Sequence, residues 1–251
     1  MPHSVDLKNV AIVLCEPQIP ENIGGAARAM ANMGLERLIV VKPKSLAQEK
    51  IYPMATAGAR HLIDSMEVVD DLKTALQEFN WVVGTTARLG SHRKAMTVEN
   101  MAARLISMTG ENKVALVFGR EDRGLSTEDV RLCHQLVNIR TAGFSSLNLA
   151  QAVLLVCYEL FKAGSDKPRE SAPRLANKFD LEAMYDQLSE LLVRIDFINP
   201  ENPDHWMDNI RRFFTRHPLT ARDVKIVRGI CRQVDWYTER RFKKMEAKKK
   251  D

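Results

Sequence analysis

The sequence lacks the residue spacings from which proteins build most disulfide frameworks and zinc sites. Its four cysteines, Cys15, Cys133, Cys157 and Cys231, form no C-x-x-C pair, and its six histidines form no H-x-x-x-H. Neither kind of site is therefore encoded locally. We expect a protein that needs no metal and works in a reducing cytoplasm.

Long hydrophobic runs are missing as well. The most apolar stretch, LNLAQAVLLVCYELF, is interrupted by Gln151 and Glu159, and it is shorter than the about 20 residues that a membrane-spanning helix needs. The first residues, MPHSVDLKN, contain no apolar segment of the kind found in secretory signals. We expect neither export nor a membrane partner.

Net positive charge is absent from most of the chain and concentrated at one end. Residues 211–250 hold 14 Lys or Arg against 4 Asp or Glu, whereas residues 1–210 hold 23 against 27. A solvated lysine tail would explain part of this excess. An electrostatic footprint for nucleic acid is favoured, because arginines also precede the tail within helical patterns. The predicted RNA-binding arginines of this region are Arg211, Arg212, Arg216, Arg228 and Arg232.

The pattern of elements predicts an α/β domain followed by a helical one. Short β-branched runs, several of them apolar on both faces, alternate with helical patterns over residues 1–164, which is typical of a buried parallel sheet. Gly34 and Gly164 are predicted to cap the helices before them. Residues 165–175 have the composition of a linker, and residues 176–251 form a purely helical pattern.

Three loops lie where predicted strands end, at the edge where open α/β sheets bind ligands. They are PENIGGAARAMANMG (20–34), VFGREDRGLS (117–126) and TAGFSSLNLAQAV (141–153), and the turn GTTAR (84–88) joins them. Because Gly24 and Gly25 are adjacent, the first loop is neither a P-loop nor a dinucleotide fingerprint.

Each loop also has a plain structural interpretation. Asn22 and either Ser145 or Ser146 could cap helices, and Gly119 and Gly124 could be turn glycines. A cap explains neither Arg28 within the first helix nor Glu121 directly after Gly119. Taken together, the loops indicate a site.

In this order, NIGGAARAMANMG, LVFGREDRGLS and SSLNLAQAV resemble the three motifs of the SPOUT superfamily of RNA methyltransferases, in its 2′-O-ribose methylating branch. Within that branch, VVGTTAR, IRRFFTRH and VRGI are similar to the bacterial TrmJ-type tRNA methyltransferases. The resemblance implies a parallel SPOUT sheet with a C-terminal trefoil knot, a homodimer with its sites at the subunit interface, and S-adenosyl-L-methionine as cofactor.

The resemblance also implies which residues act. The catalytic set would be Arg28, Asn22, Glu121, Ser146 and Asn148. The cofactor would be held by Thr85, Thr86, Ala87, Gly119, Ile139, Ser145, Ser146 and Leu147.

Methyl transfer to a ribose hydroxyl requires in-line alignment of oxygen, methyl and sulfur. No His or Cys lies in the motifs to act as a base, and a guanidinium is effectively never neutral. We therefore expect Arg28 to hold RNA phosphate and stabilise negative charge on oxygen, while Asn22, Ser146 and Asn148 orient the groups and Glu121 pairs with an arginine or an amide. Gly24 and Gly25 would let the backbone approach the ligand closely.

By resemblance the substrate is tRNA, methylated on C or U at position 32 of the anticodon loop. Two alternatives remain. One is an rRNA 2′-O-ribose methyltransferase, although such enzymes usually carry their RNA-binding module before the methyltransferase domain. The other is a non-catalytic RNA-binding protein on this scaffold. Six C-terminal aromatic residues are expected mainly to pack as helix faces, with base stacking as the alternative. They are Trp206, Phe213, Phe214, Trp236, Tyr237 and Phe242.

Overall fold

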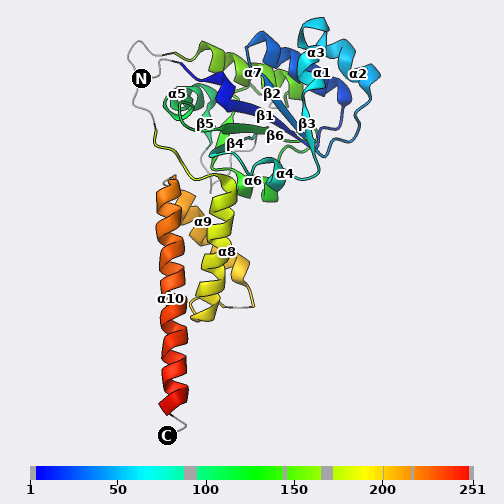
Figure 1. Cartoon of the computed structure of the whole chain (residues 1–251). Coiled ribbons are helices and arrows are strands. Elements are labelled where there is room, and N and C mark those ends of the chain that lie inside the picture. Colours follow the sequence, from blue (N-terminus) through cyan, green and yellow to red (C-terminus); the bar gives the residue numbers. More distant parts are fainter. Residues whose placement is uncertain are drawn as a thin grey trace. The chain divides into compact units, whose positions relative to one another are not determined.

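The computed structural model describes residues 4–87, 95–143, 146–164, 172–199, 201–215 and 218–248, with side chains described up to Thr238 and at Arg240. The chain forms two compact units, Met1–Pro173 and Arg174–Asp251. Figure 1 shows the sheet of the first unit and the helices of the second.

The first unit is built on a seven-stranded sheet in which every pairing is parallel, in the order β3-β2-β1-β6-β4-β7-β5. The central strands β1, β6 and β4 are buried on both faces, apart from the last residue of β4. The predicted parallel α/β architecture is confirmed. The strands are β1 Val10–Cys15, β2 Arg37–Val41, β3 Glu67–Val69, β4 Trp81–Thr85, β5 Met96–Thr97, β6 Val114–Phe118 and β7 Gln135–Asn138.

Helices cover both faces of this sheet (Figure 1). One face carries α1 (Pro20–Asn32), α2 (Gln48–Ala55), α3 (Arg60–Asp64), α5 (Val98–Met108) and α7 (Leu149–Lys162), with the short turn η2 (Ala57–Ala59). The turn η1 (Leu7–Asn9) directly precedes β1. The other face packs on the short helices α4 (Leu72–Ala75) and α6 (Thr127–Leu132).

Strand register brings the loops of the predicted site together. Leu14 lies beside Phe118, Gly84 beside Val117, and Thr85 beside Val137. The segments that leave β1, β6, β4 and β7 therefore start next to one another at the carboxyl edge of the sheet, as the sequence predicted.

The glycine pair of α1 serves helix packing. A Cβ on Gly24 would lie 2.1 Å from the carbonyl oxygen of Ile51 in α2, and one on Gly25 would lie 2.9 Å from the Cβ of Ala150 in α7. The expectation that these glycines face a ligand is therefore wrong, because the close approach that they permit is between α1 and its neighbouring helices.

Of the two predicted helix caps, one is confirmed. Gly34, with φ +75°, follows the end of α1 at Asn32 in the left-handed conformation. The predicted Gly164 cap is wrong, because α7 ends at Lys162, Ala163 is extended, and Gly164 forms an antiparallel bridge with Ser4.

The second unit contains α8 (Lys178–Arg194), α9 (Pro203–Thr215) and α10 (Ala221–Lys248). Its small core includes Met184, Ile198 and Val224. In a reciprocal capping box at the start of α10, the Thr220 amide donates to the Asp223 carboxylate at 2.8 Å and the Asp223 amide donates to the Thr220 hydroxyl at 3.2 Å. Across the described part of the chain, no helix is both long and apolar enough to span a membrane.

Candidate active site

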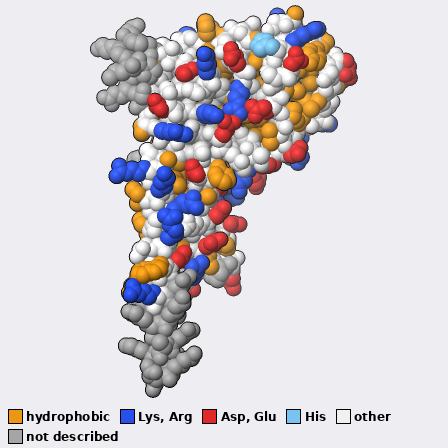
Figure 2. Space-filling view, viewed as in Figure 1, with side chains coloured by type: hydrophobic (Ala, Val, Ile, Leu, Met, Phe, Trp, Pro, Cys, Tyr) orange, Lys and Arg blue, Asp and Glu red, His pale blue; other side chains and the backbone are white. Residues whose placement is uncertain are grey.

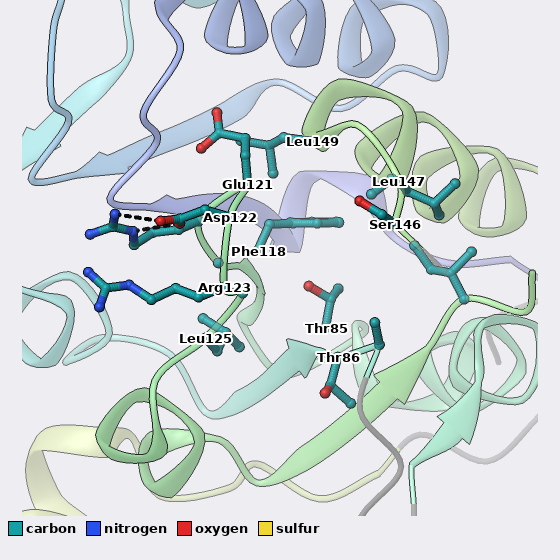
Figure 3. A pocket seen from close by; sticks show the side chains of 16 residues that line it. Thr85, Thr86, Phe118, Glu121, Asp122, Arg123, Leu125, Ser146, Leu147 and Leu149 are labelled. Carbon is teal, nitrogen blue, oxygen red and sulfur yellow. Dashed lines mark hydrogen bonds and ion pairs between the residues drawn. The ribbon is translucent and has the colours of Figure 1, made fainter. Parts of the chain in front are cut away.

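A cavity of about 330 Å³ lies at the carboxyl edge of the sheet, between the loops that follow β4, β6 and β7 (Figure 3). Its size is at the lower end of the range for small-molecule sites. Seven of the predicted cofactor residues line it, and Ser145 lies outside the described residues. The walls are formed by Thr85, Thr86, Ala87, Phe118, Gly119, Arg120, Glu121, Asp122, Arg123, Gly124, Leu125, Ile139, Ser146, Leu147, Leu149 and Ala152.

Two glycines close the loop after β6. A Cβ on Gly119 would lie 2.2 Å from the backbone of Gly124 and Leu125, and Gly124 itself has φ +70°. The Gly124 amide donates to the Arg120 carbonyl at 2.8 Å. Gly124 is therefore a turn glycine, and Gly119 is needed because any side chain would open the loop.

The opposite wall is fixed by hydrogen bonds within the sheet. The Thr85 hydroxyl donates to the Val117 carbonyl at 3.1 Å, and the Thr86 amide donates to the Val137 carbonyl at 2.9 Å. The Asn138 side chain donates to the Thr86 carbonyl at 2.8 Å. The main-chain groups of Thr86 therefore hold this segment to β7.

Glu121 binds the segment of chain that enters α1. One carboxylate oxygen accepts from the Gln18 amide at 2.8 Å, and the other accepts from the Ile19 amide at 3.3 Å and from the Asn22 side chain at 2.8 Å. Ile19, the residue before α1, makes no side-chain capping bond. The carboxylate therefore lies near the positive end of the α1 dipole, where negative charge is favourable.

Asn22 and Asn148 continue this network to α7. The Asn148 side chain donates to the Asn22 side-chain oxygen at 2.8 Å, and the Asn148 oxygen accepts from the amides of Ala150 and Gln151. Asn148 is thus the N-cap of α7, a role that the sequence analysis considers for Ser145 or Ser146. Asn22 is buried and does not cap a helix. The network joins all three sequence motifs.

Sequence reasoning missed Arg120 and Asp122. The Arg120 guanidinium makes two bonds of 2.9 Å to the Asp122 carboxylate and one of 3.3 Å to Glu16, at the end of β1. Its hydrogen bonds hold the pKa of Asp122 below the ordinary value. Figure 3 shows Asp122 at the edge of the cavity, with dashed lines for its hydrogen bonds to the guanidinium. The signal is the run Arg-Glu-Asp-Arg between two glycines, in which the sequence analysis assigns a role to the glutamate alone.

Arg28 does not join the cavity of its own chain. It is exposed, it does not line the cavity, and it makes no hydrogen bond or ion pair with another described residue. Successive residues of a helix are 100° apart, so Arg28 projects between the directions of Gly24 and Gly25, away from the sheet.

The C-terminal arginines fall into two groups. Arg211 lies 2.8 Å from the Glu182 carboxylate, with its guanidinium 4.4 Å from the centre of the Tyr185 ring, and Arg228 donates to the Gln187 side chain at 3.1 Å. Arg212 and Arg232 are exposed and make no hydrogen bond or ion pair with another residue that the structure describes, whereas Arg216 lies outside the described residues. Only the second group presents its charge outward.

The packing expected of the C-terminal aromatic residues is wrong for four of them. Trp206, Phe213, Trp236 and Tyr237 are 48%, 65%, 50% and 51% exposed. Phe214 packs against the core of the unit, and the side chain of Phe242 lies outside the described residues. Helical spacing identified which face of a helix carries the aromatic residues. The three helices of this unit, however, are too few to cover every such face.

Comparison with known proteins supplies the family. The SpoU rRNA Methylase family matches residues 9–158, and the domain described as "tRNA methyltransferase TrmJ, C-terminal domain" matches residues 179–249. The chain belongs to the TrmJ family of methyltransferases. The predicted membership and the predicted methyltransferase activity are therefore confirmed.

Relatives and a solved structure cover nearly the whole chain. The tRNA (cytidine/uridine/adenosine-2′-O-)-methyltransferase TrmJ of Pseudomonas aeruginosa is 36% identical over 244 residues, which is 89% of this chain and 93% of the relative. The tRNA (cytidine/uridine-2′-O-)-methyltransferase TrmJ of Pectobacterium atrosepticum is 37% identical, over 91% and 97%. The crystal structure of TrmJ from Z. mobilis ZM4 superposes with a TM-score of 0.78 at 33% identity, covering 90% of this chain and 98% of that one.

Proposed function

We propose that this protein works in the cytoplasm and transfers a methyl group from S-adenosyl-L-methionine to the ribose 2′-hydroxyl of a pyrimidine, C or U at position 32, in the anticodon loop of tRNA. The observation that carries the proposal is the cavity at the sheet edge, whose walls and flanking polar network come from all three motifs. The names of the TrmJ relatives support tRNA and the 2′-oxygen.

The chemistry of the cavity fits the cofactor. Phe118, Leu125 and Leu149 offer apolar surface for a flat heteroaromatic ring, and the charged side chains of the lining carry both signs, as the amino-acid part of this cofactor does. When bound, S-adenosyl-L-methionine supplies an electrophilic methyl group on a sulfonium sulfur. The residues that would hold it are Thr85, Thr86, Ala87, Gly119, Ile139, Ser145, Ser146 and Leu147.

The other site residues position the acceptor. No His or Cys is among the described residues that line the cavity, so the site offers no ordinary neutral base. The guanidinium of Arg28 binds the RNA phosphate and stabilises negative charge on the attacking oxygen. Ser146 orients the ribose, while Glu121, Asn22 and Asn148 hold the loops at fixed distances through their hydrogen bonds.

A homodimer would bring Arg28 to a cavity. Leu154, Leu155, Tyr158 and Phe161 are all exposed on the side of α7 that faces away from the sheet. The α1 helix packs against α7, so its outward Arg28 lies on the same side of the unit. Pairing of these surfaces would bury the apolar side chains and place the Arg28 of a second copy near the site.

The proposed domain boundaries also follow from the resemblance to the family. Residues 1–164 are the methyltransferase domain, with a trefoil knot in its C-terminal part. Residues 165–175 are the linker, and residues 176–251 are a tRNA-binding extension. The charge of the last forty residues and the match of residues 179–249 to a tRNA methyltransferase domain support this division.

An rRNA substrate is the second candidate, because the family that matches residues 9–158 is described as a family of rRNA methylases. The C-terminal match favours tRNA, since it covers the part of the chain that the first family does not.

The test is incubation with radiolabelled S-adenosyl-L-methionine and either unmodified tRNA or rRNA fragments, followed by nuclease digestion and mass mapping. One 2′-O-methylpyrimidine at position 32 is expected. Label in rRNA alone would keep the chemistry and overturn the substrate, and label at adenosine would overturn the pyrimidine preference. No label in either RNA would favour the non-catalytic alternative.

A further inference from the structure

Gly229, within the VRGI segment, stands inside α10 without a structural reason in this chain. A Cβ added there would meet no described atom within 4 Å, and the backbone is not in the left-handed conformation that favours glycine. Glycine is a poor helix former compared with almost any other residue. Neither packing nor conformation therefore accounts for it.

The surroundings of Gly229 form a defined face. At 100° per residue, Val224 and Cys231 turn inward and are buried, whereas Gly229 points in nearly the opposite direction. Ile226 and Ile230 flank it on one side and are 53% and 57% exposed. The solvent face of α10, as we call it, consists of half-buried Gly229 and the exposed residues Arg222, Lys225, Ile226, Ile230, Arg232, Gln233, Trp236, Tyr237 and Arg240.

This face carries positive charge without compensating acids. Residues 221–238 contain two acidic side chains, and both are occupied elsewhere, because Asp223 closes the capping box and Asp235 lies 2.6 Å from Arg194 of α8. Arg222, Lys225 and Arg232 make no hydrogen bond or ion pair with another described residue. Figure 2 shows Lys and Arg side chains alternating with hydrophobic ones along α10.

We propose that the solvent face of α10 is the RNA-contacting surface of the extension, with the RNA backbone closest at Gly229 and unpaired bases stacked on Trp236 and Tyr237. The inference deepens the proposed function and rests on it. From Arg222 to Arg240 the face is about 27 Å long, enough to follow several phosphates. Single-stranded RNA presents phosphates and unstacked bases side by side, which matches cations beside exposed rings.

A second copy of α10 fits this face poorly. Laid against it, a second copy would bring Arg222, Lys225 and Arg232 close to like charges, with no acidic side chain between residues 222 and 238 of that face to offset them. A polyanion such as RNA would instead be attracted by these positive charges.

The decisive variant is Gly229→Ala. Alanine removes the helix-breaking effect, so the melting temperature should rise by roughly 2–4 °C. The added methyl blocks close approach, so the dissociation constant for unmodified tRNA, measured by fluorescence anisotropy, should increase about fivefold or more. The matched control is Gly58→Ala, because a Cβ at Gly58 also meets no described atom within 4 Å; it should leave tRNA binding unchanged.

The salt dependence of tRNA binding distinguishes the ionic contribution of this face from the stacking contribution. Arg232→Gln should reduce the slope of log affinity against log salt by about 0.7, whereas Tyr237→Ala should weaken binding with the slope unchanged. Arg174→Gln removes an exposed charge of the same unit outside this face, and Phe213→Ala removes an exposed ring of α9. Both controls should bind tRNA as the unaltered protein does.

The outcomes separate the two proposals. If the unaltered protein methylates tRNA but Gly229→Ala and Arg232→Gln bind it normally, this inference alone is overturned. It is also overturned if Tyr237→Ala changes the sedimentation coefficient, which would make the face an interface between copies. If the unaltered protein does not methylate tRNA, the proposed function fails first.

Discussion

Glu121→Gln tests whether the network between the three motifs holds the site together. The carboxylate accepts three hydrogen bonds, two of them at 2.8 Å, all from donors that belong to the entry of α1. A glutamine keeps one acceptor oxygen and turns an amide group toward another donor. One of the two short bonds must therefore be lost.

The magnitude follows from charged hydrogen bonds, each worth about 1.5–3 kcal/mol, and from the cost of about 1–3 kcal/mol for a donor left unpaired. Because Glu121 is only partly buried, we expect Glu121→Gln to lower the free energy of unfolding of the first unit by about 2 kcal/mol, at the lower end of that range. Methylation should fall as well, since the β6 loop would no longer be held against α1.

The assay is urea unfolding followed by the fluorescence of buried Trp81, with Trp206 and Trp236 replaced by Phe so that only the first unit reports. Glu36→Gln, an exposed carboxylate outside the network, is the control and should change stability by less than about 0.5 kcal/mol. Equal stabilities for Glu121→Gln and the control would refute the role given to the network.

Two further perturbations test the packing and the surface charges of the first unit. Gly24→Ala should destabilise that unit by about 3 kcal/mol, because its Cβ would overlap the Ile51 carbonyl and α2 must move; an unchanged urea midpoint would contradict this packing. Hydrogen bonds from Arg37 and Lys113 lower the pKa of Glu78 from 4.5 to about 2. The stabilisation from this depressed pKa is fully present above about pH 4.5 and is lost as the pH falls toward 2; since Glu78 is largely exposed, we expect about 1 kcal/mol, absent in Glu78→Gln.

Much of the fold was predictable because its signals are local. Buried parallel strands produce runs that are apolar on both faces, and the capping residues Gly34 and Thr220 announce helix ends within a few positions. The site was predictable in outline, since strands in a parallel sheet must deliver their loops to one edge.

Pairings between distant segments were not predictable in this way. Glu121 lies about a hundred positions from the Gln18 and Ile19 amides that it binds, and the Arg120–Glu16 bond spans a similar separation. No periodicity encodes such contacts. The prediction for Gly24 and Gly25 is wrong for the same reason. A glycine in a helix indicates that another part of the structure approaches closely, but the sequence does not show which part.

Arg28 offers the sharpest test of the proposed dimer. Its outward direction distinguishes an arrangement in which each chain uses its own Arg28 from one in which a second copy supplies it. If each chain used its own Arg28, every mixture of an Arg28→Ala variant with an inactive cavity variant would stay inactive. If a second copy supplies Arg28, a mixed dimer of Arg28→Ala and Ser146→Ala contains one site in which both residues are intact.

Random exchange of subunits makes half of the dimers mixed, so the mixture should regain about a quarter of the unaltered activity per site, whereas each variant alone methylates little tRNA. Arg28→Ala should still bind S-adenosyl-L-methionine in a calorimetric titration, because Arg28 does not line the cavity. Lack of recovery, after subunit exchange has been verified with a tagged copy, would mean that Arg28 must reach its own cavity when RNA binds. The outward direction of Arg28 on α1 makes recovery the expected result.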